Sequence, residues 1–169
     1  MADVFDQATR SRIMRSVPGR NTSPELIVRR ALHRRGFRYR LHHPQLLGHP
    51  DLVFVSRRKV LFVHGCFWHR HSCSNGQSTP ATRVAYWSAK FERNQQRDRT
   101  VRRTLRKLGW GVMVVWECQL RTSKLANTIS SIIYFWKAEY AAPDRRPAER
   151  HRGGGEGTRY APLRLAQSA

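Results

Sequence analysis

The chain has 169 residues with a hydrophobic content of 40%, which suffices for one core and leaves no room for two full domains. Its 32 Lys and Arg against 11 Asp and Glu give a formal net charge of +21. This charge favours a polyanionic partner, nucleic acid first, over an arginine-rich surface that is merely solvated. Since no apolar stretch is as long as a membrane span and no secretory signal opens the chain, we expect a cytoplasmic protein without membrane contact.

Residues 1–21 are polar and basic and have too little apolar surface to fold alone, so we expect an arm that becomes ordered on a partner. A helix is predicted from residues 23–25, where an N-cap hydroxyl, a proline and an acid form a start signal. Gly36 is expected to end it. The alternation of apolar and basic residues over 37–41 predicts a half-buried strand.

Two apolar segments, 51–55 and 60–63, are separated by a short basic turn and predict an antiparallel hairpin. Such a hairpin brings its two ends, Asp51 and His64, to the same edge of the sheet. A carboxylate beside a buried strand needs a compensating charge or hydrogen bonds. Asp51 and His64 are therefore the first pair along the chain that could take part in catalysis or metal binding.

The remaining segments are a polar loop over 74–82, a long basic helix over 86–108, an apolar strand over 111–116 and an amphipathic helix over 125–136. The composition then changes to Ala, Pro, Gly and Arg, and we expect residues 141–169 to form a basic disordered tail. The order of elements predicts an α/β sandwich with a mixed central sheet, formed by one domain over 22–140.

The segment 64–73 contains three of the eight histidines and two of the three cysteines. Cys66, His71 and Cys73 lie close together in it, and Cys118 follows another strand. Three thiolates and one imidazole form a closed tetrahedral set of the kind that holds structural zinc. The alternative is three unrelated cysteines, with Cys118 buried in the core.

A second group combines Asp51, Glu25, His64 and His69. A carboxylate at one strand end and histidines at the next suit magnesium and its waters, the means of phosphodiester hydrolysis. A rigid zinc loop would hold His69 where a general acid or base must stand. In the alternative interpretation, Asp51 caps a turn and the two histidines are surface residues.

Phe67 and Trp68 are adjacent on a glycine-flanked loop, so at least one of them is expected to be exposed and to stack on nucleic-acid bases. Trp87, which opens the basic helix, either joins them or packs in the core. The cations of this helix are expected to follow a phosphate backbone. They include Arg93, Arg97, Arg99, Arg102, Arg103, Arg106 and Lys107.

These residues belong to longer motifs: ATRSRIMR at 8–15, Gly48-x-Pro50-Asp51, HGCFWH at 64–69, His71-x-Cys73, PATR at 80–83 and Trp116-Glu117-Cys118. On these motifs, over about residues 1–137, the chain resembles the very-short-patch repair endonucleases. The resemblance implies a restriction-endonuclease-like α/β/α sandwich with a structural zinc. It also implies nicking 5′ of the thymine in T·G mismatches that arise when 5-methylcytosine deaminates.

The same resemblance implies roles for single residues. Asp51 would bridge two magnesium ions, with the main-chain carbonyl of Val63 as a further ligand. His64 and Glu25 would hold metal-bound waters, and His69 would be the general acid/base. The zinc ligands would be Cys66, His71, Cys73 and Cys118. The residues that wedge into the duplex would be Phe67, Trp68 and Trp87, with Met14 of the arm on the opposite face.

The resemblance further implies a nucleoid-associated monomer that acts on double-stranded DNA, with mismatch-repair proteins and a repair polymerase as partners. Two alternatives stay open at this point. One is a zinc-stabilised DNA- or RNA-binding module without chemistry. The other is a nuclease of the same fold with a different target.

Overall fold

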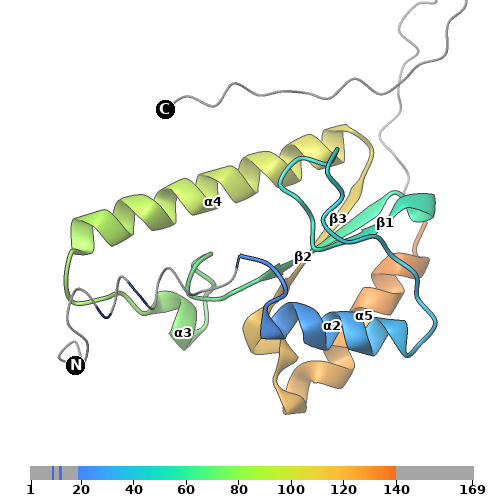
Figure 1. Cartoon of the computed structure of the whole chain (residues 1–169), viewed down its shortest axis with the longest axis horizontal. Coiled ribbons are helices and arrows are strands. Elements are labelled where there is room, and N and C mark those ends of the chain that lie inside the picture. Colours follow the sequence, from blue (N-terminus) through green and yellow to red (C-terminus); the bar gives the residue numbers. More distant parts are fainter. Residues whose placement is uncertain (1–8, 10–11, 13–18, 140–169) are drawn as a thin grey trace, which may run out of the picture.

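The computed structural model describes Thr9, Arg12 and residues 19–139, so Met14 and the predicted tail lie outside the described residues. Three strands form one sheet in the order β1 (Leu52–Phe54), β2 (Lys59–His64) and β3 (Gly111–Trp116) (Figure 1). β1 pairs antiparallel with β2, which confirms the predicted hairpin. Because β2 pairs parallel with β3, the sheet is mixed, also as predicted.

The main helices are α2 (Ser23–His33), α4 (Val84–Lys107) and α5 (Thr122–Lys137), and short ones are α3 (Ser74–Gln77), η1 (Val55–Arg57) and η2 (Glu117–Leu120). α4 covers one face of the sheet, and α2 and α5 lie together on the other (Figure 1). Within residues 19–139, no helix has both the length and the apolar character that crossing a membrane requires.

Strand β2 lies between two hydrophobic cores. Its Leu61 and Val63 side chains belong to the core that includes α2 and α5, whereas Val60 and Phe62 belong to the core that includes α4. This alternation is expected of a strand whose two faces are both covered. All six residues of β2 are buried, so the last of them, His64, is held at a fixed place at the edge of the sheet.

The strand predicted over 37–41 is wrong. This segment makes one isolated antiparallel bridge, between Arg40 and Val53. The backbone of His42 has a φ of 43°, in the left-handed region, so the chain turns away from the sheet before a second pair forms. The alternating pattern therefore reflects a segment that packs one of its sides against β1 but forms no continuous backbone pairing with it.

Helix α2 begins one residue earlier than its start signal implied, because the N-cap is Thr22 and Ser23 is already helical. The Thr22 hydroxyl donates a hydrogen bond to Glu25 Oε1 at 2.9 Å, and the Thr22 N–H points to the same oxygen at 3.4 Å. Glu25 thus completes a capping box at the first turn. The polar loop predicted over 74–82 contains the short helix α3.

A buried lysine connects the start of β2 to the end of α5. Lys59 is 2% exposed, and its Nζ donates hydrogen bonds to the main-chain carbonyls of Phe135, Trp136 and Ala138. The last carbonyls of a helix have no partner within the helix and carry partial negative charge. Lys59 therefore caps α5 from the neighbouring strand.

We predict that Lys59→Met lowers the free energy of unfolding by about 1–3 kcal/mol, because buried carbonyls lose a charged donor. Urea unfolding of the variant and the wild type measures this difference. Lys137→Met removes an exposed lysine from the same helix end, and we expect it to change stability by less than about 0.5 kcal/mol. Equal effects of the two substitutions would show that Lys59 has no capping role.

Candidate functional site

Four side chains converge just beyond the ends of β2 and β3. The ligand atoms of Cys66, His71, Cys73 and Cys118 all lie within 4.8 Å of one another. β2 and β3 are parallel and end together, with His64 paired to Trp116, so the segments that follow them meet. The structure thus brings together all four residues that the sequence predicted as one ligand set, and this cluster could hold a metal ion.

The thiols of Cys66 and Cys73 differ in how readily they lose a proton. Burial raises the pKa of the Cys66 thiol to about 12, whereas the hydrogen bond with His71 lowers the pKa of Cys73 to about 6. A bound divalent cation stabilises thiolates and makes such differences small.

The backbone of the cluster is also tightly packed, because a Cβ on Gly76 would lie 2.1 Å from the carbonyl oxygen of His71. Only glycine fits at that position.

We predict that Cys73→Ala releases the metal from this cluster and lowers the melting temperature, because one of its four candidate ligands is lost and with it the stabilisation that a bound ion gives to the fold. Elemental analysis of the purified protein and thermal unfolding measure the two effects. Ser72→Ala, a change at an exposed neighbour, is the matched control and should alter neither. Undiminished metal content in the Cys73 variant would remove this residue from the ligand set.

A second cluster joins the end of β2 to the middle of α4. His69 Nδ1 lies 2.5 Å from Asp98 Oδ2, and His64 Nδ1 lies 4.0 Å from the same oxygen. The two imidazole rings are stacked, with centroids 3.8 Å apart. Since a carboxylate can only accept, His69 carries its proton on Nδ1 and leaves Nε2 free to accept another.

Burial determines the charges in this second cluster. It lowers the pKa of His64 to about 3, and His69 beside it acts in the same direction, so His64 is neutral at pH 7. Burial acts to raise the pKa of Asp98, but the hydrogen bond from His69, together with charge interactions that include Arg97, outweighs it and the net shift is downward. Asp98 is therefore an ionised acceptor that orients His69.

Sequence reasoning missed Asp98. It is one of only two acids in the 24 residues of α4 and lies between Arg97 and Arg99. An isolated acid in so basic a helix was the available signal. Its partner, His69, is distant in sequence, so the pairing depends on how α4 packs across the sheet.

Asp51 lies beside the C-terminal end of β2, where the Val63 N–H donates a hydrogen bond to its Oδ2 at 2.7 Å. Burial raises the pKa of Asp51 to about 6; the Val63 hydrogen bond opposes this shift and the nearby Glu25 adds to it. A cation at this carboxylate would offset the cost of burial. Asp51, Glu25, Val63, His64 and His69 all line one cleft of about 690 Å³.

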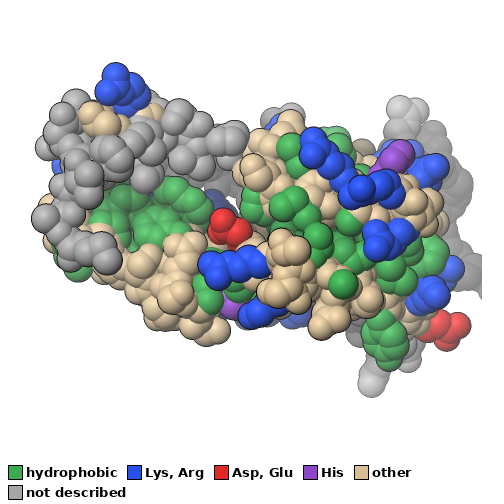
Figure 2. Space-filling view, turned by 90° about the horizontal axis from the view of Figure 1, so that it is seen from below, with side chains coloured by type: hydrophobic (Ala, Val, Ile, Leu, Met, Phe, Trp, Pro, Cys, Tyr) green, Lys and Arg blue, Asp and Glu red, His purple; other side chains and the backbone are tan. Residues whose placement is uncertain are grey.

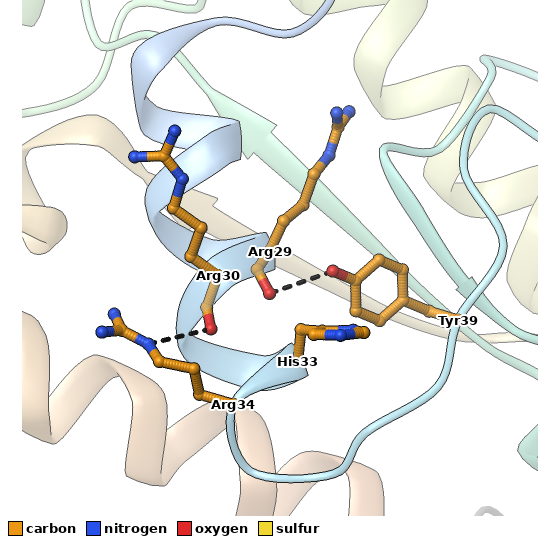
Figure 3. Close-up of a pocket in the computed structure, with 5 residues that line it drawn as sticks. All are labelled: Arg29, Arg30, His33, Arg34 and Tyr39. Atoms are coloured by element: carbon orange, nitrogen blue, oxygen red, sulfur yellow. Dashed lines mark hydrogen bonds between the residues drawn. The ribbon is translucent and has the colours of Figure 1, made fainter.

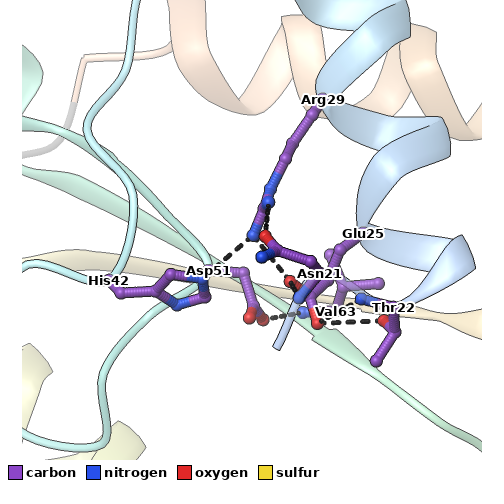
Figure 4. Close-up of polar contacts among 7 residues, drawn as sticks. All are labelled: Asn21, Thr22, Glu25, Arg29, His42, Asp51 and Val63. Atoms are coloured by element: carbon purple, nitrogen blue, oxygen red, sulfur yellow. Dashed lines mark hydrogen bonds and ion pairs between the residues drawn. The ribbon is translucent and has the colours of Figure 1, made fainter. Parts of the chain in front are cut away.

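Glu25 is fully hydrogen-bonded in this cleft (Figure 4). Besides the Thr22 contacts to Oε1, its Oε2 accepts from the Asn21 N–H at 3.0 Å and from Arg29 Nη2 at 2.6 Å. A carboxylate has about four acceptor positions, so any further donor must replace or share one of these. The buried Arg29 also contacts Asn21 Oδ1 at 2.5 Å and His42 Nε2 at 3.1 Å. Arg29 was another residue that sequence reasoning did not identify.

Arg29 also lines a separate basic pocket of about 480 Å³ on α2 (Figure 3). The other lining residues are Arg30, His33, Arg34 and Tyr39, and the Tyr39 hydroxyl donates to the main-chain oxygen of Arg29 at 2.9 Å. Seen from below, several Lys and Arg side chains lie over the part of the molecule that α2 and α5 form (Figure 2). This face carries positive charge well suited to phosphate.

The aromatic residues predicted to contact bases form one group at the start of α4. Phe67 and Trp68 are partly exposed, whereas Trp87 is 4% exposed. The rings of Phe67 and Trp87 are 5.7 Å apart, and Lys90 Nζ lies 5.2 Å from the Trp68 ring. Trp68 and Lys90 line the same cleft as Asp51. The structure therefore places Phe67 and Trp68, which we call the aromatic edge, beside the polar groups of the cleft. The buried Trp87 packs against Phe67.

We predict that Asp51→Asn stabilises the protein above pH 6 in the absence of magnesium. The folded pKa of about 6 exceeds the ordinary value of 3.8, so this group's contribution to stability is fully present below about pH 4 and is lost as the pH rises through 6. The gain at pH 7 should be about 3 kcal/mol and should shrink by about half at pH 5. Urea unfolding across this range measures it. Glu92→Gln, at an exposed position of α4, is the control and should not change stability in this pH-dependent way. A gain from Asp51→Asn that does not vary with pH would contradict the raised pKa of Asp51.

Known proteins with similar sequences are nucleases. The profile of a family described as DNA mismatch endonuclease Vsr matches residues 2–75. The type II nicking enzyme V.XorIIP of Xanthomonas oryzae pv. oryzae is 50% identical over 120 residues, 71% of this chain and 88% of that protein. The DNA mismatch endonuclease Vsr of Escherichia coli K12 is 45% identical over 121 residues, 72% of this chain and 77% of that protein. The type II nicking enzyme V.NmeAIP of Neisseria meningitidis is 38% identical over 127 residues, 75% of this chain and 90% of that protein.

A mixed α/β fold with a polar cleft at the sheet edge, together with these relatives, defines an endonuclease. More particularly, the chain belongs to the Vsr family of DNA mismatch endonucleases. The resemblance inferred from the sequence motifs is thereby confirmed. DNA is the class of substrate that this family membership indicates.

Proposed function

We propose that the protein nicks DNA 5′ of the thymine in T·G mismatches produced by deamination of 5-methylcytosine, and that this reaction depends on magnesium. The observation that carries the proposal is the meeting of Asp51, His64 and an oriented His69 in one cleft beside a partly exposed aromatic edge. The name of the E. coli relative, a DNA mismatch endonuclease, agrees with this reaction. The arrangement of α4 on one face and α2 with α5 on the other supports a restriction-endonuclease-like sandwich.

The donor set fits magnesium. Asp51 supplies a partly buried carboxylate whose pKa is raised mainly by its removal from water, and oxygen is the ligand that Mg²⁺ prefers. Asp51 and the main-chain oxygen of Val63 would hold up to two ions, with His64 and Glu25 binding waters of their hydration shells. When bound, the ions would neutralise charge on the scissile phosphate and favour ionisation of water. Glu25 would exchange one of its hydrogen bonds to Thr22 or Asn21 for such a water.

His69 would transfer the proton in this reaction. The hydrogen bond from its Nδ1 to Asp98 fixes the ring and the tautomer, so Nε2 is the nitrogen that accepts a proton from attacking water or returns one to the leaving oxygen. Asp98 stabilises the imidazolium that forms. His64, stacked on His69 and neutral, restricts the ring to one plane.

The aromatic edge would determine the preference for mismatched over matched duplex. Opening a base step costs a few kcal/mol, and least at a mismatch, so a ring inserted there selects mispairs by the energy of unstacking. We propose that Phe67 and Trp68 form the wedge supported by Trp87, with Met14 acting from the opposite face. Zinc held by Cys66, His71, Cys73 and Cys118 would fix the loop that carries both the wedge and His69.

The remaining organisation follows from this function. Residues 1–21 would form an arm on the DNA, 22–140 the nuclease domain and 141–169 a basic tail. The protein would act as a monomer in the cytoplasm, on DNA of the nucleoid, before a repair polymerase and other mismatch-repair proteins take over the nicked duplex.

We predict magnesium-dependent nicking of a labelled duplex that carries one T·G mismatch in a cytosine-methylation context. EDTA added after purification and Asp51→Ala should each reduce the rate by more than about a thousandfold, because the ion's charge and its activated water are lost. Glu92→Ala, which removes an exposed acid on α4, should cleave like the wild type. Tight binding without cleavage across contexts would instead favour a binding module, and cleavage of matched duplex at equal rate would favour another target.

A further inference from the structure

A buried arginine on α2 connects two residues that line the cleft. Arg29 is 7% exposed, and its guanidinium reaches from the helix to Glu25 and to His42 (Figure 4). Glu25 and His42 both line the cleft, whereas Arg29 itself is not among the lining residues. A buried charge is costly unless it is paired. The contacts of Arg29 therefore determine where its guanidinium can lie.

The two terminal nitrogens of Arg29 have three acceptors. Nη2 donates to Glu25 Oε2 at 2.6 Å and contacts His42 Nε2 at 3.1 Å, and Nη1 donates to Asn21 Oδ1 at 2.5 Å. In contrast, Nε of Arg29 is buried and has no hydrogen-bond partner among the described residues. A buried donor without a partner lowers stability. The guanidinium is therefore placed for its Nη contacts at the expense of Nε.

His42 is the acceptor in its contact with Arg29, because a guanidinium has no acceptor atom. Burial and then the charge of Arg29 lower the pKa of His42, which agrees with a neutral ring that carries its proton on Nδ1. The backbone of His42 has a φ of 43°, which is uncommon for a residue other than glycine. The hydrogen bond to Arg29 thus ties this turn of the chain to α2.

Arg29 is also a special partner for Glu25. Among the described residues, the other donors to Glu25 all belong to Asn21 and Thr22, which directly precede the helix. In the reaction proposed above, Glu25 gives up one of those hydrogen bonds to bind a water of the magnesium shell. The ion pair with Arg29 remains during this exchange and keeps the carboxylate in place.

We propose that Arg29 is a positioning residue for the proposed cleavage: it holds the Glu25 carboxylate at the cleft and is itself held by His42. The inference rests on the proposed function, in which Glu25 binds a metal-held water. Arg29 touches neither the DNA nor the reacting atoms, so it acts through Glu25.

A double-mutant cycle tests this dependence on Glu25 with magnesium and T·G duplex. We expect Arg29→Met to lower kcat by about ten- to a hundredfold, because a displacement of about 1 Å can cost that much. The KM for the duplex should change by less than about twofold. In a Glu25→Gln background, Arg29→Met should lower kcat by less than about a further twofold. Equal losses in both backgrounds, or no loss in either, would overturn the proposal.

Arg38→Met removes an exposed arginine just beyond α2. It is the matched control for the loss of one positive charge and should leave kcat unchanged. If it lowers kcat as much as Arg29→Met does, the effect belongs to net charge and the positioning role is refuted.

A pair of substitutions at His42 gives a test that does not depend on how well the Arg29 variant folds. His42→Gln keeps an acceptor for Arg29, whereas His42→Leu removes it. We expect His42→Gln to retain kcat within about threefold of the wild type and His42→Leu to lower it at least about tenfold, both with full zinc content. Equal kcat values for the two variants would refute the role of His42.

The contacts of Arg29 can also be measured without cleavage, by NMR of ¹⁵N-labelled protein free of DNA and magnesium. We expect separate Nη–H signals for Arg29, because its hydrogen bonds slow rotation of the guanidinium, and merged signals in Glu25→Ala. Merged signals in the wild type would overturn the inference. A wild type with separate signals that never nicks T·G duplex would refute the proposed function. A wild type that nicks, with full kcat retained in Arg29→Met, would refute the positioning role alone.

Discussion

The parallel pairing of β2 with β3 is the constraint on which both clusters depend. The two strands end together, with His64 opposite Trp116. Cys66 and Cys118 each follow two residues later, and the Cys118 N–H donates to Cys66 Sγ at 3.4 Å. A slip of one residue in this register would turn every β2 side chain to the opposite face. It would separate the cysteines and remove His64 from the cleft at the same time.

The charges buried near this edge are compensated mostly within the protein. Glu25 is paired with Arg29 at 2.6 Å, and Asp98 with His69 at 2.5 Å. Asp51 has only the Val63 N–H as its hydrogen-bond donor among the contacts described. A partly buried carboxylate with one hydrogen-bond donor is costly, so stability and the proposed activity oppose each other at Asp51. The fold tolerates this cost because the four central residues of β2, from Val60 to Val63, are apolar and contribute to both hydrophobic cores.

Much of the candidate site could be predicted from the sequence because most of its residues lie close together along the chain. Cys66, His71 and Cys73 lie on one loop, and the hairpin that joins Asp51 to His64 follows from two apolar runs and a short turn. Contacts between distant elements were less accessible. Asp98 reaches His69 only through the packing of α4, and the single bridge at Arg40 depends on a backbone turn at His42 that no periodicity reveals.

The attachment of Lys59 to the last carbonyls of α5 fixes where anything joined after residue 139 can begin. Lys59 and His64 are the two ends of β2, and five steps of a strand at about 3.3 Å each separate them by about 17 Å. The chain therefore leaves the domain at the end of the sheet opposite the cleft. A fluorescent label attached at Ala138 would therefore sit far from a ligand in the cleft, whereas a label attached at Arg20, which lines the cleft, would sit beside it.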